Sequence, residues 1–147
     1  MHCAGGAGRV HCAGGDGRSR RRRPAVIGVG LDAVDIGRFR ALLARRPTMA
    51  GRLFTAGERS YAAGQLDPTP SLAARFAAKE AVMKALGVGL GAFAWRDVEV
   101  VRLDGGQPSL LVTGAAEELA SGQGVGQWRI SLTHTDTLAE AIVVALP

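Results

Sequence analysis

The pattern of apolar and polar residues predicts strands and short helices from about residue 25 onward. Residues 25–34 form an apolar run rich in β-branched side chains, which is typical of a central strand. Residues 36–46 repeat apolar positions at helical spacing and predict a first helix. Residues 52–64 predict a second short helix, in which Thr55 is the N-cap of a capping box.

Residues 72–86 predict a long helix that is apolar on almost every side. Eleven of these fifteen residues are apolar, and the four others are Arg75, Lys79, Glu80 and Lys84. Ser71 is the expected N-cap and Gly87 the expected C-cap. A helix that is hydrophobic all round is normally buried, and buried charges are costly unless they are paired or bound. We therefore expect this helix to bring a charged ligand into the protein.

The second half of the chain predicts strands around one more helix. Residues 98–103 alternate, and a turn at 104–106 leads to a second strand beginning at residue 108. Residues 114–122 form a short alanine-rich helix, and residues 128–135 and 138–146 predict a hairpin. The fold class is therefore α+β, with a largely antiparallel sheet packed with a long buried helix.

The charge of the chain is concentrated at its N-terminus. The net charge is +5, and residues 1–23 hold six arginines and one aspartate, so the remainder is neutral overall. We interpret residues 1–24 as a disordered Gly- and Arg-rich extension, which a start codon placed upstream of the true one would also explain. Residues 25–147 form one domain.

The extension also suggests an alternative function, that of a nucleic-acid or metal-binding module. Its candidate zinc ligands are His2, Cys3, His11 and Cys12. Zinc modules usually pair ligands two to four residues apart, which adjacent His-Cys pairs do not do. Deleting residues 1–23 would separate this function from one located in the body. With no apolar segment typical of a signal peptide or membrane span, and no cysteine in the body, a cytoplasmic protein is expected.

Two acidic residues are candidates for binding a metal. Asp32 lies near the end of the first strand, within a GxG segment that superficially fits a dinucleotide-binding fingerprint. That fingerprint requires an acidic residue about twenty positions further on to bind a ribose, and this chain has Arg52 there. The negative charge of Asp32 would also repel the pyrophosphate. Asp32 is therefore either a metal ligand or an ordinary turn or cap aspartate.

Glu80 is the second candidate, and it lies one helical turn before Lys84. A surface ion pair is the ordinary interpretation, but the surrounding turn is apolar. Magnesium usually takes one or two protein carboxylates and completes its shell with water and phosphate, which Asp32 and Glu80 would satisfy. Arg75, Lys79 and Lys84 would then supply positive charge for a polyphosphate.

Four segments in order resemble one family. They are GVGLDAVDIGRF, LFTAGERSY, RFAAKEAVMKALG with the GVGLG that follows, and SLTHT. Together they resemble the holo-acyl-carrier-protein synthase type of 4′-phosphopantetheinyl transferase. The resemblance implies the fold of that family for residues 25–147. It also implies transfer of the phosphopantetheine arm of coenzyme A to a serine of apo acyl carrier protein, with release of adenosine 3′,5′-bisphosphate.

The resemblance also implies roles for individual residues. Asp32 and Glu80 would bind Mg²⁺, with Mn²⁺ as an alternative, and Lys84 would complete the catalytic group. Arg75, Lys84 and His134 would contact the phosphates of coenzyme A. Gly87 and Thr135 would line the same pocket. Either Glu80 or a metal-bound water would take the serine proton, and the carrier would belong to fatty-acid, polyketide or peptide synthesis.

Partner binding and assembly follow from charge and length. Arg38 and Arg45 are seven residues apart and share a helical face, which is either a solvated surface or a docking site. Members of the family dock the acidic carrier protein on their first helix, which favours docking. Because the body has one copy of a fold that larger relatives contain twice, the resemblance implies a homotrimer with coenzyme A at each subunit interface. His134 would then be contributed by the neighbouring subunit.

Overall fold

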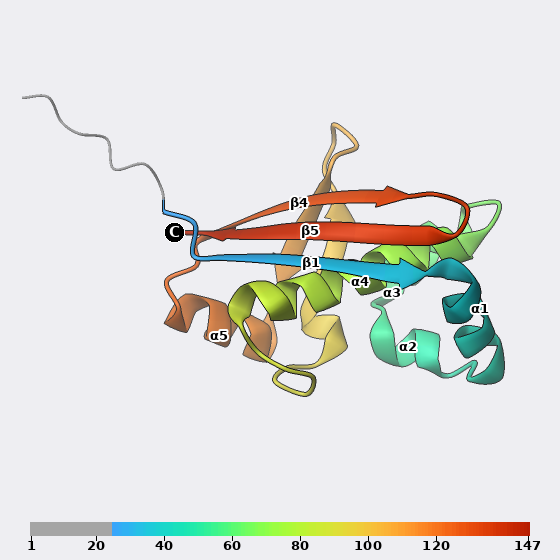
Figure 1. The fold of residues 1–147 in the computed structure, drawn as a ribbon, viewed down its shortest axis with the longest axis horizontal. Coiled ribbons are helices and arrows are strands. Elements are labelled where there is room, and N and C mark those ends of the chain that lie inside the picture. The colour runs from blue at the N-terminus through green and yellow to red at the C-terminus, as the bar shows by residue number, and fades with distance from the viewer. Residues whose placement is uncertain (1–24) are drawn as a thin grey trace, which may run out of the picture.

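The computed structural model describes residues 25–147 and shows a three-stranded sheet covered on one side by helices (Figure 1). The sheet is antiparallel with the order β1-β5-β4, formed by β1 (Gly28–Asp35), β5 (Leu138–Leu146) and β4 (Gln127–His134). A separate antiparallel hairpin consists of β2 (Val98–Arg102) and β3 (Pro108–Val112). The antiparallel pairing was predicted from the sequence, whereas the division into two sheets was not.

The helix α4 (Pro68–Leu86) forms the centre of the domain. Its small apolar residues pack beneath β1 and β5, and Ala77, Ala78, Ala81 and Val82 have no exposed surface. The predicted burial is thus confirmed except along the strip of Phe76, Glu80 and Lys84, of which Lys84 is exposed. The predicted N-cap at Ser71 was wrong, because Asp67 caps the helix by accepting a hydrogen bond from Thr69 N. The prolines that indicated a loop lie in the first turn, where missing N–H groups have no helical partner to lose.

The smaller helices surround this centre. They are α1 (Ile36–Arg45), α2 (Met49–Leu53), α3 (Ala56–Ala63) and α5 (Gly114–Gly122), with a 3₁₀ turn, η1 (Trp95–Asp97). The predicted capping box of Thr55 is present at the start of α3. Residues 52–64 nevertheless form parts of two helices, because Phe54 and Thr55 are extended between α2 and α3. The helix at 114–122 and the hairpin of β4 and β5 were predicted correctly.

None of the helices in residues 25–147 is long and apolar enough to cross a bilayer. The disorder, zinc and nucleic-acid interpretations of the extension fall on residues 1–24 and lie outside the described residues.

Candidate active site

The strand β1 lies directly on the backbone of α4, and two glycines make this approach possible. A Cβ atom at Gly28 would lie 1.8 Å from the carbonyl oxygen of Ala85, and one at Gly30 would lie 1.8 Å from that of Ala81. No larger residue fits at such distances without moving the strand. The GxG segment therefore serves close packing of strand and helix, which agrees with the rejection of a dinucleotide fingerprint.

Asp32 occupies the next position of β1 that faces α4. Its Oδ1 accepts a hydrogen bond from Lys84 Nζ at 2.7 Å, and Lys84 also donates to the Leu31 carbonyl at 2.9 Å. The side chain of Asp32 is only 12% exposed, and its Oδ2 is buried without a hydrogen-bond partner among the described residues. A buried carboxylate oxygen in this state needs a cation or a proton to offset its desolvation.

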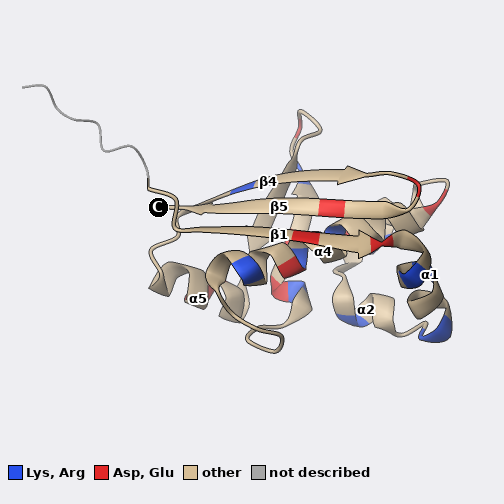
Figure 2. Ribbon diagram, in the orientation of Figure 1, with Lys and Arg blue, Asp and Glu red and all other residues tan. Residues whose placement is uncertain are grey.

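Glu80 stands beside Asp32 on the adjoining turn of α4. Burial raises the pKa of Glu80 to about 7, the neighbouring Asp32 carboxyl adds to the increase, and Lys84 opposes it. A divalent cation placed between the two carboxyl groups would favour the ionised form of Glu80. The structure thus brings together Asp32, Glu80 and Lys84, as the sequence predicted. In Figure 2, acidic positions on β1 lie beside acidic and basic positions on α4.

The donor set fits magnesium better than a metal that is held by protein ligands alone. Within residues 25–147, no cluster of three or more His, Cys, Asp or Glu side chains is placed to hold a metal ion. Two carboxylates, with the remaining positions filled by water and phosphate oxygens, form the usual magnesium arrangement. The orphaned Oδ2 of Asp32 is the observation that favours this ligand set.

Arg75 and His134 lie together in a different cavity. This cavity has a volume of about 300 Å³, and Arg75 and His134 line it with Tyr61 and Arg102. Arg75 and Glu80 are five residues apart on α4, so their side chains leave the helix about 140° apart. The predicted site residues therefore form two separate groups within the chain. Sequence reasoning gave no role to Tyr61 on α3 or Arg102 on β2. Tyr61 ends the LFTAGERSY segment and could have been found there, whereas Arg102 lies in none of the four segments.

Gly87 and Thr135 hold the backbone next to these groups. Gly87 ends α4 in the left-handed conformation with φ 67°, and Val88, Gly89 and Leu90 after it line a small cavity beside Glu80 and Lys84. Thr135 Oγ1 accepts a hydrogen bond from Leu138 N at 3.1 Å in the turn after β4. Neither is among the residues that line these two cavities, so both shape the site through the backbone.

Lys79 does not belong to the site, which corrects its expected role in binding polyphosphate. Its ammonium group is 2.9 Å from Glu58 Oε2, and both side chains are fully buried. A residue that faces the core cannot contact a ligand at the surface of α4. No pattern in the sequence indicated this difference, because Lys79 and Lys84 flank Glu80 in the same apolar helix.

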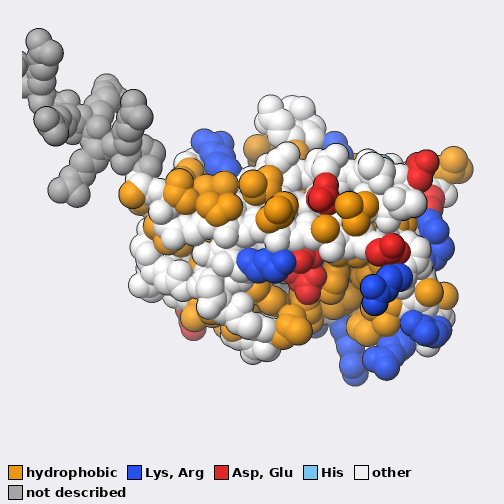
Figure 3. Space-filling view, in the orientation of Figure 1, with side chains coloured by type: hydrophobic (Ala, Val, Ile, Leu, Met, Phe, Trp, Pro, Cys, Tyr) orange, Lys and Arg blue, Asp and Glu red, His pale blue; other side chains and the backbone are white. Residues whose placement is uncertain are grey.

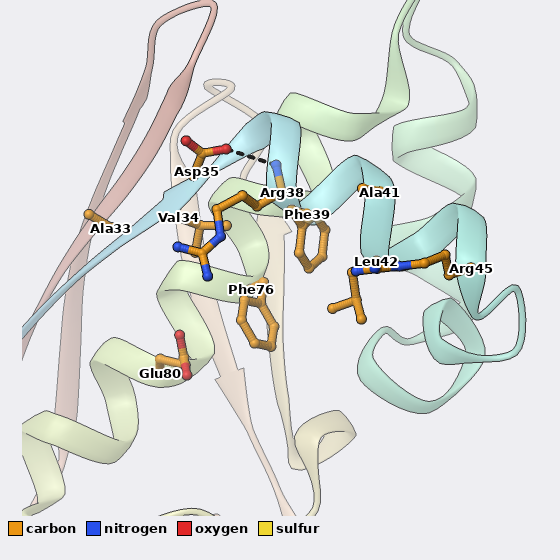
Figure 4. A pocket seen from close by; sticks show the side chains of 10 residues that line it. All are labelled: Ala33, Val34, Asp35, Arg38, Phe39, Ala41, Leu42, Arg45, Phe76 and Glu80. Carbon is orange, nitrogen blue, oxygen red and sulfur yellow. Dashed lines mark hydrogen bonds between the residues drawn. The ribbon is translucent and has the colours of Figure 1, made fainter.

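Arg38 and Arg45 line a groove that leads to Glu80. The groove has a volume of about 470 Å³ between α1 and α4, with Phe39, Leu42 and Phe76 as its apolar lining (Figure 4). Lys and Arg side chains gather over α1 and α2 on this side of the molecule (Figure 3). The predicted common face of Arg38 and Arg45 is therefore confirmed, and it adjoins the acidic pair.

The outer face of the sheet carries exposed apolar side chains. Val29 and Leu31 are 55% and 58% exposed, and Ile142, which pairs with Leu31, is 40% exposed. Hydrophobic side chains form a band over the strands in Figure 3. A group of exposed apolar side chains on adjacent strands is typical of a protein contact.

Comparisons with known proteins agree with this geometry. The profile of the 4′-phosphopantetheinyl transferase superfamily matches residues 28–145, so the chain belongs to this family. A holo-[acyl-carrier-protein] synthase of Frankia casuarinae is 51% identical over 121 residues, which cover 82% of this chain and 98% of that protein.

Solved structures support the same family. The crystal structure of holo-[acyl-carrier-protein] synthase from Neisseria meningitidis has a TM-score of 0.75 at 31% identity and covers 82% of this chain and 98% of that one. The enzyme from Bacillus anthracis, solved in complex with CoA (3′,5′-ADP), has a TM-score of 0.69 at 31% identity, with coverages of 82% and 96%. The predicted fold and family are confirmed.

Proposed function

We propose that this chain is a holo-[acyl-carrier-protein] synthase. It transfers the 4′-phosphopantetheine arm of coenzyme A to a serine of apo acyl carrier protein and releases adenosine 3′,5′-bisphosphate. The family match over residues 28–145 and the named relatives support this reaction. The observation from the chain itself that carries the proposal is the group of Asp32, Glu80 and Lys84, in which two adjacent carboxyls meet one ammonium group.

Asp32 and Glu80 would hold the metal of the reaction, for which Mg²⁺ is the first choice. When bound, magnesium would neutralise charge on the diphosphate of coenzyme A during transfer. Lys84 is 55% exposed and reaches Asp32 from the rim, so its ammonium group can turn toward a phosphate oxygen. A pKa of about 7 allows the Glu80 carboxyl to exchange protons near neutral pH, which acceptance of the serine proton would require.

The separation of the two groups supports a site shared between subunits. Asp32 and Glu80 interact on one side of α4, whereas Arg75 and His134 line a cavity on another side. A heterologous contact that closes into a ring places one side of a subunit against a different side of the next. The exposed apolar band at Val29, Leu31 and Ile142 provides a surface for such self-association. A homotrimer with coenzyme A between subunits is the proposed assembly.

The carrier protein would dock along α1. The groove provides apolar lining beside two arginines, which suits an acidic partner with apolar side chains at its docking surface. Because Glu80 lies at one end of the same groove, a carrier docked there presents its serine close to the proposed metal site. Attraction between these arginines and the acidic carrier would also increase the association rate.

The function is tested by incubating the protein with coenzyme A, Mg²⁺ and an apo carrier protein. Intact-mass spectrometry should show addition of one phosphopantetheine group to the carrier, and formation of adenosine 3′,5′-bisphosphate should match it. Asp32→Ala and Glu80→Ala should abolish transfer, and EDTA should do so reversibly. If apo carriers from fatty-acid, polyketide and peptide synthesis all keep their mass with wild-type protein, the proposal is wrong.

A further inference from the structure

The groove between α1 and α4 has a floor of aromatic and aliphatic side chains. The rings of Phe39 and Phe76 stack with their centroids 5.3 Å apart. The ring of Trp95, which does not line the groove, lies 5.0 Å from that of Phe76. Leu42 and Val34 continue the apolar lining. Because packed rings hold one another in place, the floor is already formed before a ligand binds.

The groove also has the size of a small-molecule site. Its volume is about 470 Å³, and small-molecule sites typically measure roughly 300–1,000 Å³. Such sites combine a mostly apolar lining with a few charged or polar groups. The charged groups of this lining are Asp35, Arg38, Arg45 and Glu80. The groove therefore has the dimensions and the chemistry to bind a ligand that is partly apolar and partly charged.

The charged side chains are divided between the two ends of the groove. Glu80 lies at one end and Arg45 at the other (Figure 4). Arg38 lies between the carboxylates of Asp35 and Glu80, and Asp35 also accepts a hydrogen bond from Arg38 N. Of the described residues that line the groove, none places a carboxylate next to Arg45. The groove is therefore polarised, with its least compensated cation at the end of α1.

The sequence around Arg45 strengthens this polarity. Residues 36–57 contain five arginines and no acidic residue. Arg45 and Arg46 are adjacent and exposed where α1 ends, so a ligand can reach them from solvent. This end of the groove therefore attracts an anion, whereas Glu80 repels one from the opposite end.

We propose that the groove binds a free fatty acid, with its carboxylate at Arg45 and its alkyl chain along the floor of Leu42 and Phe76. An apolar floor with a cation at one end matches a chain that has a single anionic head. The orientation is fixed, because a reversed molecule would place its carboxylate against Glu80. The bound chain covers the surface proposed to receive the carrier, so the fatty acid acts as an inhibitor that competes with the carrier. That consequence rests on the proposed function, whereas the binding itself does not.

Isothermal titration calorimetry with octanoate, decanoate and dodecanoate tests the site directly. A fully buried methylene group increases affinity by about fourfold, so partial burial in an open groove should give about two- to fourfold per methylene. Decyltrimethylammonium has a chain of the same length as decanoate but the opposite head charge, and it should bind about tenfold more weakly. Affinity that is independent of chain length, or equal for the two head groups, would overturn the inference.

Two exposed alanines of α1 provide matched variants. Ala41 lines the groove, whereas Ala44 does not. Ala41→Glu places a carboxylate beside the floor and should lower the affinity for decanoate by about tenfold, while Ala44→Glu should stay within about twofold of the wild type. Glutamate is a good helix former, so both variants should melt at nearly the wild-type temperature. If Ala41→Glu binds decanoate as the wild type does, the chain binds elsewhere and the inference is wrong.

Steady-state kinetics separate this inference from the proposed function. Decanoate should raise KM for the carrier and leave both kcat and KM for coenzyme A unchanged. The calorimetric titrations need no transfer activity. A protein that transfers no phosphopantetheine but binds decanoate with the expected dependence on chain length and on Ala41→Glu refutes the function and supports the fatty-acid site. A protein that transfers the group, but whose KM for the carrier is unchanged when decanoate is saturating, refutes the site.

Discussion

The ammonium nitrogen of Lys79 lies 2.9 Å from Oε2 of Glu58, and neither side chain has any exposed surface. Lys79 also donates to the carbonyls of Trp95, at 3.0 Å, and Val98, while Glu58 accepts from Val100 N at 3.0 Å. Burial lowers the pKa of Lys79, and Glu58 opposes this change. The pair joins α3, α4 and the β2 hairpin, so it fixes the rotation of the helix that carries Glu80.

Lys79→Met should destabilise the protein because it leaves Glu58 charged and buried. Breaking a buried pair typically lowers the free energy of unfolding by about 3–5 kcal/mol, which urea unfolding monitored by circular dichroism would measure. Changing both residues, as Glu58→Gln with Lys79→Met, should restore part of the stability, because no charge remains unpaired. If Lys79→Met unfolds like the wild type but loses affinity for coenzyme A, Lys79 belongs to the binding site and the structural role is wrong.

Gly30→Ala should disrupt the contact between β1 and α4. The added Cβ would lie 1.8 Å from the Ala81 carbonyl oxygen, so strand and helix must separate. Overpacking of this kind costs about 1–3 kcal/mol and occasionally more, and it also moves Asp32 away from Glu80. Thermal melting and transfer activity should both decline. The control is Gly51→Ala, since a Cβ at Gly51 in α2 meets nothing within 4 Å; equal melting temperatures for the two variants would contradict the close approach.

Magnesium should stabilise the protein more as the pH rises. The folded-state pKa of Glu80 is raised from 4.5 to about 7, so the folded protein binds the extra proton and loses stability as the pH rises between these values. A divalent cation binds the ionised carboxylates and offsets that loss. The increase in melting temperature on adding MgCl₂, against NaCl at equal ionic strength, should be larger at about pH 8 than at about pH 5.5. In Glu80→Gln the dependence on pH should disappear, and an unchanged dependence would exclude Glu80 as its source.

Reversing the charge of the groove should weaken carrier binding alone. The double variant Arg38→Glu and Arg45→Glu should lower carrier-protein affinity by about tenfold or more, because attraction becomes repulsion at low salt. The affinity for coenzyme A should stay at its wild-type value. Surface plasmon resonance at two salt concentrations would measure both effects. Arg59→Glu, which changes an exposed arginine outside the groove, is the control; unaltered carrier affinity in the double variant would contradict the docking site.

A shared active site should be recoverable from two inactive variants. Asp32→Ala removes one group and His134→Ala removes the other, so each variant should be inactive in the proposed homotrimer. If subunits are exchanged by unfolding and refolding the two proteins at equal concentration, about one interface in four combines an intact Asp32 with an intact His134. Transfer activity should return to about a quarter of the wild-type value. A mixture that stays inactive, while refolded wild type recovers, would show that both groups act within one subunit.

Local signals in the sequence predicted most of the fold. Alternation predicted the β2 strand, residues 128–135 and 138–146 were predicted as a hairpin, and the pattern of Thr55 and Glu58 predicted the start of α3. The start of α4 was misplaced because Pro68 and Pro70 resemble a loop until the cap at Asp67 is known. Several neighbouring polar residues are suitable N-caps by residue type. Which of them caps the helix depends on its backbone angles, which the sequence pattern does not show.

The site was predictable where a charge was unusual for its surroundings. Asp32, Glu80 and Lys84 stood out in apolar segments, and the structure brings them together. Lys79 stood out equally, but its partner Glu58 lies on another helix, and no spacing rule connects the two. Tyr61 and Arg102 meet Arg75 only through the packing of α3 and the β2 hairpin against α4. Contacts between distant segments depend on tertiary structure, which a single sequence does not specify by pattern.

The junction of β1 and α1 has a consequence for carrier selection. The strand ends at Asp35 and the helix begins at Ile36, with the Asp35 side chain accepting a hydrogen bond from Arg38 N at 2.8 Å. The surface proposed to receive the carrier thus continues directly from the strand that carries Asp32. No hinge lies between them that could adjust the position of a misplaced carrier. A foreign carrier that binds a few ångströms away from the correct position would keep its serine too far from the diphosphate for as long as it stays bound. Discrimination among carriers would therefore appear in the turnover rate as well as in affinity.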